Sequence, residues 1–344
     1  MEKKGFLTFM IGAAAGILII VFICHQVGTE KIWNQISTVG PLAFIAFFFN
    51  YSIAMLLQGK GWQIILKANG YEIKFKDIFY ATCMGQAGNF LTPSAYIGGE
   101  PIRAVYISRK YGIRKRLVFA SVFIAKFQEF TCFLLAIIIG SIEVYIHYFK
   151  MLPLGVKILL LIFNIFILLS FILLQYSIMK GKQILRPALK KIAYLGLSPR
   201  KLTRAAFYVG ESEKWIHKLY VANPKSTIKS FFLILFSMFF IFTKPMFFFI
   251  FLNNKIPFNF PELSLIFVLT QIVLALQFTP GGFGILEGGQ IGTYAIVGYD
   301  PPSAMAYLAS MRLSDITYVS LGIFLITNYG LTFLLTKNKK EKSI

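Results

Sequence analysis

The sequence contains few charged residues, and few of those are acidic. Charged side chains make up 14% of the 344 residues, with 14 Asp and Glu against 35 Lys and Arg. Soluble domains carry about 25% charged residues, so this scarcity, together with a mean hydropathy of +0.68, excludes an ordinary soluble protein. The net charge of +21 is typical of nucleic-acid-binding proteins, but here nearly all the basic residues lie in short segments between apolar runs. The sequence therefore predicts an integral membrane protein.

Cysteine and histidine are also scarce, with three of each. Cys24, Cys83 and Cys132 lie in apolar segments and lack the spacing of a metal site or a disulfide framework. No strand precedes the glycine-rich segments and no Gly-Lys-Ser/Thr follows them, which argues against a phosphate-binding loop. We therefore expect no metal, no cofactor and no catalytic residue.

Six apolar runs are long enough, or nearly so, to cross a bilayer core, which takes about 20 helical residues. The first run, residues 6–27, lacks the small-residue cleavage site of a signal peptide, so we expect it to remain as a transmembrane helix. The other five are residues 41–57, 117–142, 154–179, 231–252 and 303–335.

The segments between these runs sort by charge. Positive charge marks the cytoplasmic side of a membrane protein. The basic segments are 59–77, 103–116, 180–229 and 337–342, whereas 28–40, 142–153 and 253–262 balance to zero and 298–302 holds only Asp300. This sorting predicts that both termini face the cytoplasm.

One motif occurs twice. Thr92-Pro93 precedes Glu100, and Thr279-Pro280 precedes Glu287, with seven residues from Pro to Glu in both copies. A pair of opposite charges spaced i, i+3 follows inside an apolar run after each copy. These pairs are Lys126 with Glu129 and Arg312 with Asp315.

Each copy of the motif interrupts an apolar stretch that must begin and end on one side of the membrane. Proline and glycine break the helix, and the freed backbone groups need protein or water partners at that depth. The first stretch, 78–103, is expected to begin and end on the cytoplasmic side, and the second, 263–297, on the outer side. The breaks are Pro93, Gly98 and Gly99 in the first and Pro280, Gly281 and Gly282 in the second. We therefore predict an all-α polytopic fold of about six spanning helices plus two re-entrant helical hairpins, arranged as inverted-topology repeats.

This interpretation divides the chain into five parts. They are a first helix and outer loop (1–40), repeat 1 with its hairpin (41–179), a basic cytoplasmic segment (180–229), repeat 2 with its hairpin (230–336) and a basic tail (337–344). Apolar residues at three- to four-residue spacing in 180–229 suggest basic amphipathic helices on the membrane surface. These helices would contact anionic lipid headgroups, or the charge would simply fix the topology.

Charges at membrane depth are the candidate functional residues. A lone charge there costs about 2.5–3.5 kcal/mol on insertion scales, so the duplicated i, i+3 pairs either brace the packing or line a shared polar cavity. Glu100 lies beside Pro101 at the expected start of a half-helix, with Arg103 in the next turn, so it caps that helix or meets a polar headgroup. The predicted substrate-binding set is Glu100, Arg103, Lys126, Glu129, Glu287, Arg312 and Asp315.

The two motifs resemble those of a known family. Phe90-Leu91-Thr92-Pro93 leading to Gly98-Gly99-Glu100-Pro101, with Phe278 to Glu287 downstream, is similar to the lysylphosphatidylglycerol synthase transmembrane region, the flippase-like membrane domain of the multiple peptide resistance factor. The resemblance covers about residues 6–335. It implies translocation of aminoacylated phosphatidylglycerol in a bacterial inner membrane and resistance to cationic peptides. The soluble aminoacyltransferase domain of full-length members has no counterpart here.

The leading hypothesis is therefore a flippase for a polar phospholipid. A phosphatidylglycerol lysyltransferase, which would have to bind lysyl-tRNA, is one alternative, although no acyl-transfer site is recognisable. A non-transporting partner of a separate synthase subunit is the other. The phospholipid is the expected partner, nucleic acid is expected only for the lysyltransferase, and a homo-oligomer is compatible with the sequence.

Overall fold

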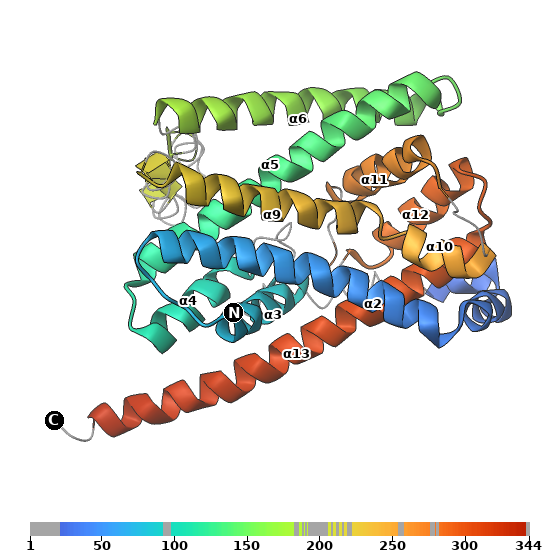
Figure 1. The fold of residues 1–344 in the computed structure, drawn as a ribbon. Helices are drawn as coiled ribbons and strands as arrows, with labels where there is room; N and C mark the ends of the chain where they lie inside the picture. The colour runs from blue at the N-terminus through green and yellow to red at the C-terminus, as the bar shows by residue number, and fades with distance from the viewer. Residues whose placement is uncertain are drawn as a thin grey trace.

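The protein is a bundle of α-helices with no strand among the residues that the structure describes (Figure 1). The computed structural model describes residues 21–91, 98–181, 222–253, 258–275 and 282–341, together with Thr279 and scattered positions between 186 and 218. Its labelled helices are α2 (Thr29–Ala68), α3 (Phe75–Leu91), α4 (Glu100–Tyr111), α5 (Lys115–His147), α6 (Leu154–Lys180), α9 (Pro224–Phe242), α10 (Met246–Asn253), α11 (Phe260–Ala275), α12 (Ile285–Ile296) and α13 (Pro301–Glu341).

Five of the described helices are long and apolar enough to cross a membrane. They are Thr29–Ala68, Lys115–His147, Leu154–Leu173, Pro224–Leu252 and Pro301–Tyr329. Each overlaps one of the apolar runs predicted from the sequence. The sixth predicted helix, 6–27, lies mostly outside the described residues, although residues 21–27 are helical.

Several predicted boundaries are wrong because amphipathic turns extend the helices beyond their apolar runs. Segment 28–40, predicted as an outer loop, forms the first part of α2, where Ile32 and Val39 are buried. Gly40, at φ 70°, and Pro41 kink this helix but do not end it. At the other end α2 continues to Ala68, because Trp62 and Leu66 face the core while the lysines of this stretch face outward.

Helices also extend into two other segments that were predicted as basic loops. Segment 103–116, predicted as a loop, is mostly the helix α4, so the first hairpin arm runs on to Tyr111. Helix α9 begins at Pro224, inside the predicted basic segment 180–229. Most of the amphipathic helices predicted for this segment lie outside the described residues. The kink predicted at Pro245 is present as the break between α9 and α10.

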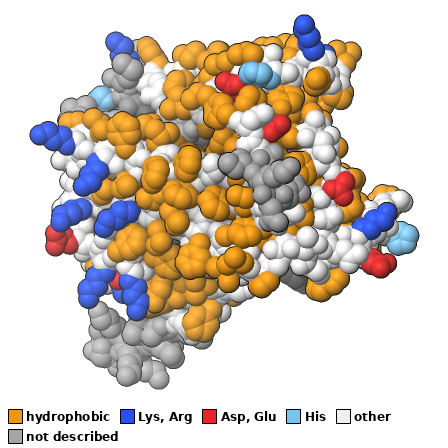
Figure 2. All heavy atoms as spheres, turned by 45° about the vertical axis from the view of Figure 1, so that its right-hand side comes forward, with side chains coloured by type: hydrophobic (Ala, Val, Ile, Leu, Met, Phe, Trp, Pro, Cys, Tyr) orange, Lys and Arg blue, Asp and Glu red, His pale blue; other side chains and the backbone are white. Residues whose placement is uncertain are grey.

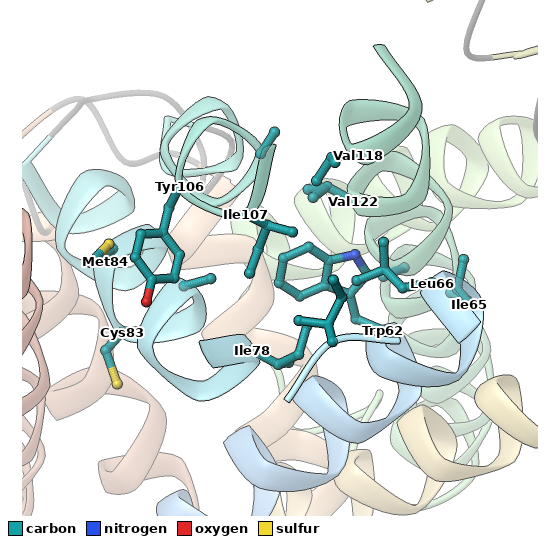
Figure 3. Packing of buried hydrophobic residues seen from close by; sticks show 14 of the residues in the cluster. Trp62, Ile65, Leu66, Ile78, Cys83, Met84, Tyr106, Ile107, Val118 and Val122 are labelled. Atoms are coloured by element: carbon teal, nitrogen blue, oxygen red, sulfur yellow. The ribbon is translucent and has the colours of Figure 1, made fainter. Parts of the chain in front are cut away.

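The core has three main parts, and two of them lie around the pairs of short helices. Trp62 and its neighbours from α2, α3, α4 and α5 form the first part (Figure 3). In the second part, the first residues of α2 pack with α10, α11, α12 and the start of α13 around Tyr294 and Phe249. Figure 1 shows α3 and α4 toward one end of the bundle and α10, α11 and α12 toward the other, with α2, α5, α9 and α13 running between them.

The outer surface of the bundle is apolar. Large hydrophobic side chains such as Leu161, Ile165 and Phe166 project from α6 into the surroundings. Figure 2 shows a face covered mainly by hydrophobic side chains, with most of the visible Lys and Arg along its left margin and others at its upper right and right edge. This is the surface expected of a protein surrounded by lipid. The chain is therefore built as a multi-pass membrane protein.

Candidate functional site

The first cluster of buried charges lies where α4 begins. Glu100 and Arg103, 2% and 5% exposed, form an ion pair with 3.2 Å between Oε2 and Nη1. Lys126 of α5 lies 2.9 Å from Glu129 Oε2 and 3.6 Å from Glu100 Oε1. The i, i+3 spacing on α5 thus brings Lys126 beside Glu129, and each charge of the cluster has an opposite charge next to it.

Glycine positions the elements that hold this cluster. A side chain on Gly99 would place its Cβ 1.8 Å from the carbonyl oxygen of Gly85, so α3 and the start of α4 cross in contact. The side-chain oxygen of Asn89, on α3, accepts a hydrogen bond of 2.6 Å from the backbone N–H of Gly99. Asn89 therefore satisfies a free donor at the start of α4, which was one of the two roles predicted for Glu100.

The indole ring of Trp62 packs against the guanidinium group of Arg103. The guanidinium carbon of Arg103 lies 4.6 Å from the centroid of the Trp62 ring. Trp62 is fully buried among residues of α2, α3, α4 and α5 (Figure 3). A cation over an indole face is attracted by the ring quadrupole, and more strongly where water is excluded. Arg103 is therefore fixed between a carboxylate and an aromatic face.

The second cluster repeats this arrangement at the start of α12. Arg312 of α13 donates from Nε to Glu287 Oε1 at 2.8 Å, and its Nη2 lies 2.8 Å from the same oxygen. The other oxygen of Glu287 accepts a hydrogen bond of 2.7 Å from the N–H of Gly284, which caps α12. The Arg312 guanidinium stacks 4.6 Å from the ring centroid of Phe283. Each cluster thus combines a glutamate in the first turn of a short helix, an arginine and an aromatic ring.

Residues that flank the two helix breaks contact each other. Phe90, in the last turn of α3, and Phe283, just before α12, contact edge to face with ring centroids 5.7 Å apart. These two residues belong to the two copies of the duplicated motif, 193 positions apart in the chain. We call this contact, with Glu100 and Glu287 in the short helices that follow each break, the junction. No described ion pair joins one charged cluster directly to the other, so the predicted site residues form two groups rather than one.

Asp315 is the one predicted site residue outside both ion-paired groups. The i, i+3 spacing suggests a pair with Arg312, but that arginine pairs with Glu287 instead. Asp315 interacts electrostatically with Lys244 and Arg312, without an ion pair shorter than 4 Å among the described residues. Lys244 comes from the break between α9 and α10. The sequence places Lys244 at a kink but gives no sign that it interacts electrostatically with Asp315.

A third group of charges lies where α3 begins and α4 ends. Asp77 accepts hydrogen bonds from Lys110 Nζ at 2.5 Å and from the Tyr111 hydroxyl at 2.6 Å. Burial raises the pKa of the Asp77 carboxyl, but these hydrogen bonds outweigh burial and hold the pKa below its ordinary value. A cavity of about 400 Å³ opens over this group. Its lining residues are Lys74, Lys76, Asp77, Tyr80, Lys110, Tyr111 and Tyr329.

The structure describes only part of the predicted hairpin breaks. Pro93, Pro280 and Gly281 lie outside the described residues. Gly98 and Gly99 form the turn into α4, and Gly282, at φ 69°, lies in the turn that leads to α12. The described residues contain no cluster of three or more His, Cys, Asp or Glu that could hold a metal ion.

Sequence reasoning missed the residues that support the charges. Trp62 and Asn89 stand in ordinary helical stretches, and nothing in their spacing links them to Arg103 or Gly99. Phe90 and Phe283 offered a weak signal, because each lies within or beside a copy of the duplicated motif. Because aromatic residues make up 17% of the chain, two phenylalanines near the motifs do not stand out from the others.

Comparison with known proteins agrees with the motifs. Residues 9–322 match the model of the family described as lysylphosphatidylglycerol synthase TM region. A UPF0104 membrane protein of Pyrococcus horikoshii is 24% identical over 330 residues, which are 91% of this chain and 95% of that protein. Another, of Methanocaldococcus jannaschii, is 33% identical over 118 residues, which are 34% of this chain and only 35% of that protein. The family match spans most of the sequence and includes both copies of the motif. The chain therefore belongs to the lysylphosphatidylglycerol synthase TM region family.

Proposed function

We propose that the protein moves the polar headgroup of a phospholipid between the two leaflets of a membrane. The observation that carries this proposal is the junction: Phe90 and Phe283, which flank the two helix breaks, contact each other within an apolar bundle. Each break is followed by a buried, ion-paired glutamate. Ionisable residues inside a membrane-spanning region mark substrate pathways by default. Broken helices at the interface of two repeats are the usual construction of a transporter site.

The arrangement of the short helices supports inverted repeats. α3 and α4 lie toward the end of the bundle where α13 finishes, and α11 and α12 lie toward the opposite end (Figure 1). The pairs therefore fit two re-entrant hairpins that enter from opposite faces. The turns at the first end belong to the basic segments, which supports the proposal that this end faces the cytoplasm.

Headgroup passage needs polar contacts but no covalent chemistry. Acyl chains would remain in lipid along the apolar outer surface while the headgroup crosses beside the junction. The charged residues would neutralise the headgroup and replace its lost water. Alternating exposure to the two sides would follow from small movements of one helix pair against the other.

Aminoacylated phosphatidylglycerol is our first candidate lipid, because the family description concerns lysylphosphatidylglycerol. Its export would lower the negative charge of the outer leaflet and so weaken binding of cationic peptides. The cytoplasmic membrane of a prokaryote is the expected location, whether the bacterial inner membrane or the membrane of an archaeon, as for the relatives above. Segment 180–229 would bind anionic headgroups at the cytoplasmic surface.

Leaflet exchange in proteoliposomes tests the proposal. Purified protein is reconstituted with phosphatidylglycerol or lysylphosphatidylglycerol labelled on an acyl chain, and a membrane-impermeant quencher is added outside. Transport brings label from the inner leaflet to the quencher, so the signal falls below the level of protein-free vesicles. Arg312→Ala should abolish this additional loss. Quenching that stops at the protein-free level for both lipids would contradict the proposal.

A further inference from the structure

Three helices enclose the cavity that lies where α3 begins and α4 ends. Tyr329 of α13 contacts Tyr80 of α3 and Tyr106 of α4, with ring centroids 6.3 and 5.2 Å apart. The volume of about 400 Å³ falls within the range of small-molecule sites, about 300–1,000 Å³. No residue that lines this cavity belongs to the junction or to the two buried charged clusters. The cavity is therefore a separate candidate site.

One lysine of the cavity is already paired. The Nζ atom of Lys110 donates hydrogen bonds to Asp77 Oδ1 at 2.5 Å and to the Tyr106 hydroxyl at 3.2 Å. It also lies 5.1 Å from the ring centroid of Tyr329. Asp77 in turn accepts hydrogen bonds from the hydroxyls of Tyr111 and Tyr106. The single carboxylate of the cavity therefore neutralises Lys110 and is held by its own neighbours.

The other two lysines of the cavity lack an opposite charge. Lys74 and Lys76 are exposed and line the same space. Among the described residues, neither has a carboxylate within 4 Å or a hydrogen bond from its Nζ atom. By contrast Lys67, also at this end of the bundle, forms an ion pair of 3.3 Å with Glu72. With three lysines against one aspartate, the lining carries two positive charges in excess.

Tyrosine adds a hydrogen-bonding group to this excess charge. Tyr80 lines the cavity, and its hydroxyl makes no hydrogen bond to any residue that the structure describes. A phenolic hydroxyl can donate to an anion. Positive charge at this end also favours a cytoplasmic orientation, but that effect requires neither a cavity nor tyrosines beside the lysines. The combination of a hollow, two unpaired lysines and a free hydroxyl is instead typical of an anion-binding site.

We propose that this cavity binds a phosphomonoester, whose phosphate is neutralised by Lys74 and Lys76 and whose alcohol part packs against the tyrosines. A phosphomonoester carries a charge of about −1.5 to −2 at pH 7, which matches the two unpaired lysines. A phosphodiester carries one charge and would leave one lysine unpaired. Phosphatidate in the adjacent leaflet and a soluble phosphate ester share the required chemistry. The inference goes beyond the proposed function and does not depend on translocation.

Calorimetric titration of the full chain in an uncharged detergent tests the site with two pairs of probes. The soluble pair is glycerol 3-phosphate, a monoester, and glycerophosphoglycerol, a diester. The lipid pair is dihexanoyl phosphatidate, a monoester, and dihexanoyl phosphatidylglycerol, a diester. At about pH 8, where the monoesters are doubly charged, the monoester of a pair that binds should bind about tenfold tighter than its diester. This is the factor for one additional charge-assisted hydrogen bond.

Single substitutions of the two lysines locate the site. Lys74→Met and Lys76→Met should each weaken binding of the monoester about tenfold, to the level of the diester, because one lysine then remains for the phosphate. Lys60→Met is the matched control. Lys60 is also exposed at this end of the bundle and lies 5.3 Å from the ring centroid of Phe75, as Lys76 lies 5.4 Å from that of Tyr80, but it does not line the cavity. The control should keep the full preference for the monoester.

The outcomes separate the source of the ligand from the existence of the site. Tighter binding of phosphatidate than of glycerol 3-phosphate would identify a lipid as the ligand, and equal binding would identify a soluble ester. Equal affinity for monoester and diester, a preference that survives both lysine substitutions, or no binding of any probe would overturn the site. A lysine-dependent preference in a protein without leaflet exchange would support the site and contradict only the proposed translocation.

Discussion

Glu287 has two roles at the residue scale. One carboxylate oxygen caps α12 through the N–H of Gly284, and the other binds Arg312. Glu262 shares only the first role, since its carboxylate accepts a hydrogen bond of 2.8 Å from the N–H of Asn259 at the start of α11, in an exposed position. Comparing the two glutamates therefore separates capping from the buried ion pair.

Glu287→Gln should destabilise the protein strongly because it leaves Arg312 without its carboxylate. Breaking a buried ion pair on one side costs about 3–5 kcal/mol, whereas loss of an exposed cap costs about 1 kcal/mol. The midpoint of thermal unfolding in detergent should therefore fall much further for Glu287→Gln than for Glu262→Gln. Equal shifts for the two variants would show that the ion pair with Arg312 adds nothing to the cap.

The lowered pKa of Asp77, where α3 begins and α4 ends, predicts that the stability of the protein depends on pH. Because its pKa is lower in the folded protein, its contribution is complete above the unfolded value of about 3.9 and is lost as the pH falls through the folded value. Asp77→Asn should cost about 1–2 kcal/mol at neutral pH. Unfolding measured in detergent should show the variant and the unaltered protein converging below pH 4. A difference that persists at pH 3 would contradict the assignment.

At the element scale, the short helices depend on close approach of backbones. Gly322 of α13 lies against α3, where an added Cβ would be 2.3 Å from the carbonyl oxygen of Cys83. Gly292 of α12 has no atom within 4 Å of the same position. Small residues permit this kind of contact between membrane helices, so the two glycines serve different purposes although both stand in helices.

Gly322→Ala should therefore separate α13 from α3 and destabilise the protein by about 1–3 kcal/mol, as overpacking does. Gly292→Ala should instead stabilise it by about 0.5–1 kcal/mol, because alanine is the better helix former. Thermal unfolding of both variants in the same detergent checks the contrast. Stabilisation by both substitutions would mean that α13 and α3 are not packed as described.

The sequence predicted the elements better than their ends. Apolar runs located the five described spanning helices, and the duplicated Thr-Pro motif located both pairs of short helices. Apolar length alone missed residues 29–39, 59–68 and 103–111, because these turns bury one face and expose the other. The i, i+3 rule found Lys126 with Glu129, but it could not choose between Asp315 and Glu287 as the partner of Arg312. That choice depends on how α12 packs against α13.

At the scale of the whole molecule, charge distinguishes the two ends. The basic turns between α2 and α3 and between α4 and α5 lie at the end where α13 finishes, and the turn between α5 and α6 lies at the opposite end (Figure 1). This separation agrees with the sorting of loops by charge. The side of the membrane that each end faces stays a prediction.

Single cysteines test that prediction in a variant that lacks Cys24, Cys83 and Cys132. An impermeant maleimide applied to intact cells should label Met151→Cys, which lies in the exposed turn after α5. It should label Tyr71→Cys, in the turn after α2, only after the membrane is opened. The reverse pattern would invert the orientation and place the basic end outside.

The central claim is that headgroups cross the membrane beside the junction of Phe90 and Phe283. The most direct measurement follows leaflet exchange in proteoliposomes of a Phe90→Cys/Phe283→Cys variant without native cysteines, before and after a short, reducible thiol crosslinker is added. We predict that exchange stops when the two breaks are joined and returns on reduction. Exchange that continues at the same rate in fully crosslinked protein would show that the headgroup takes another path.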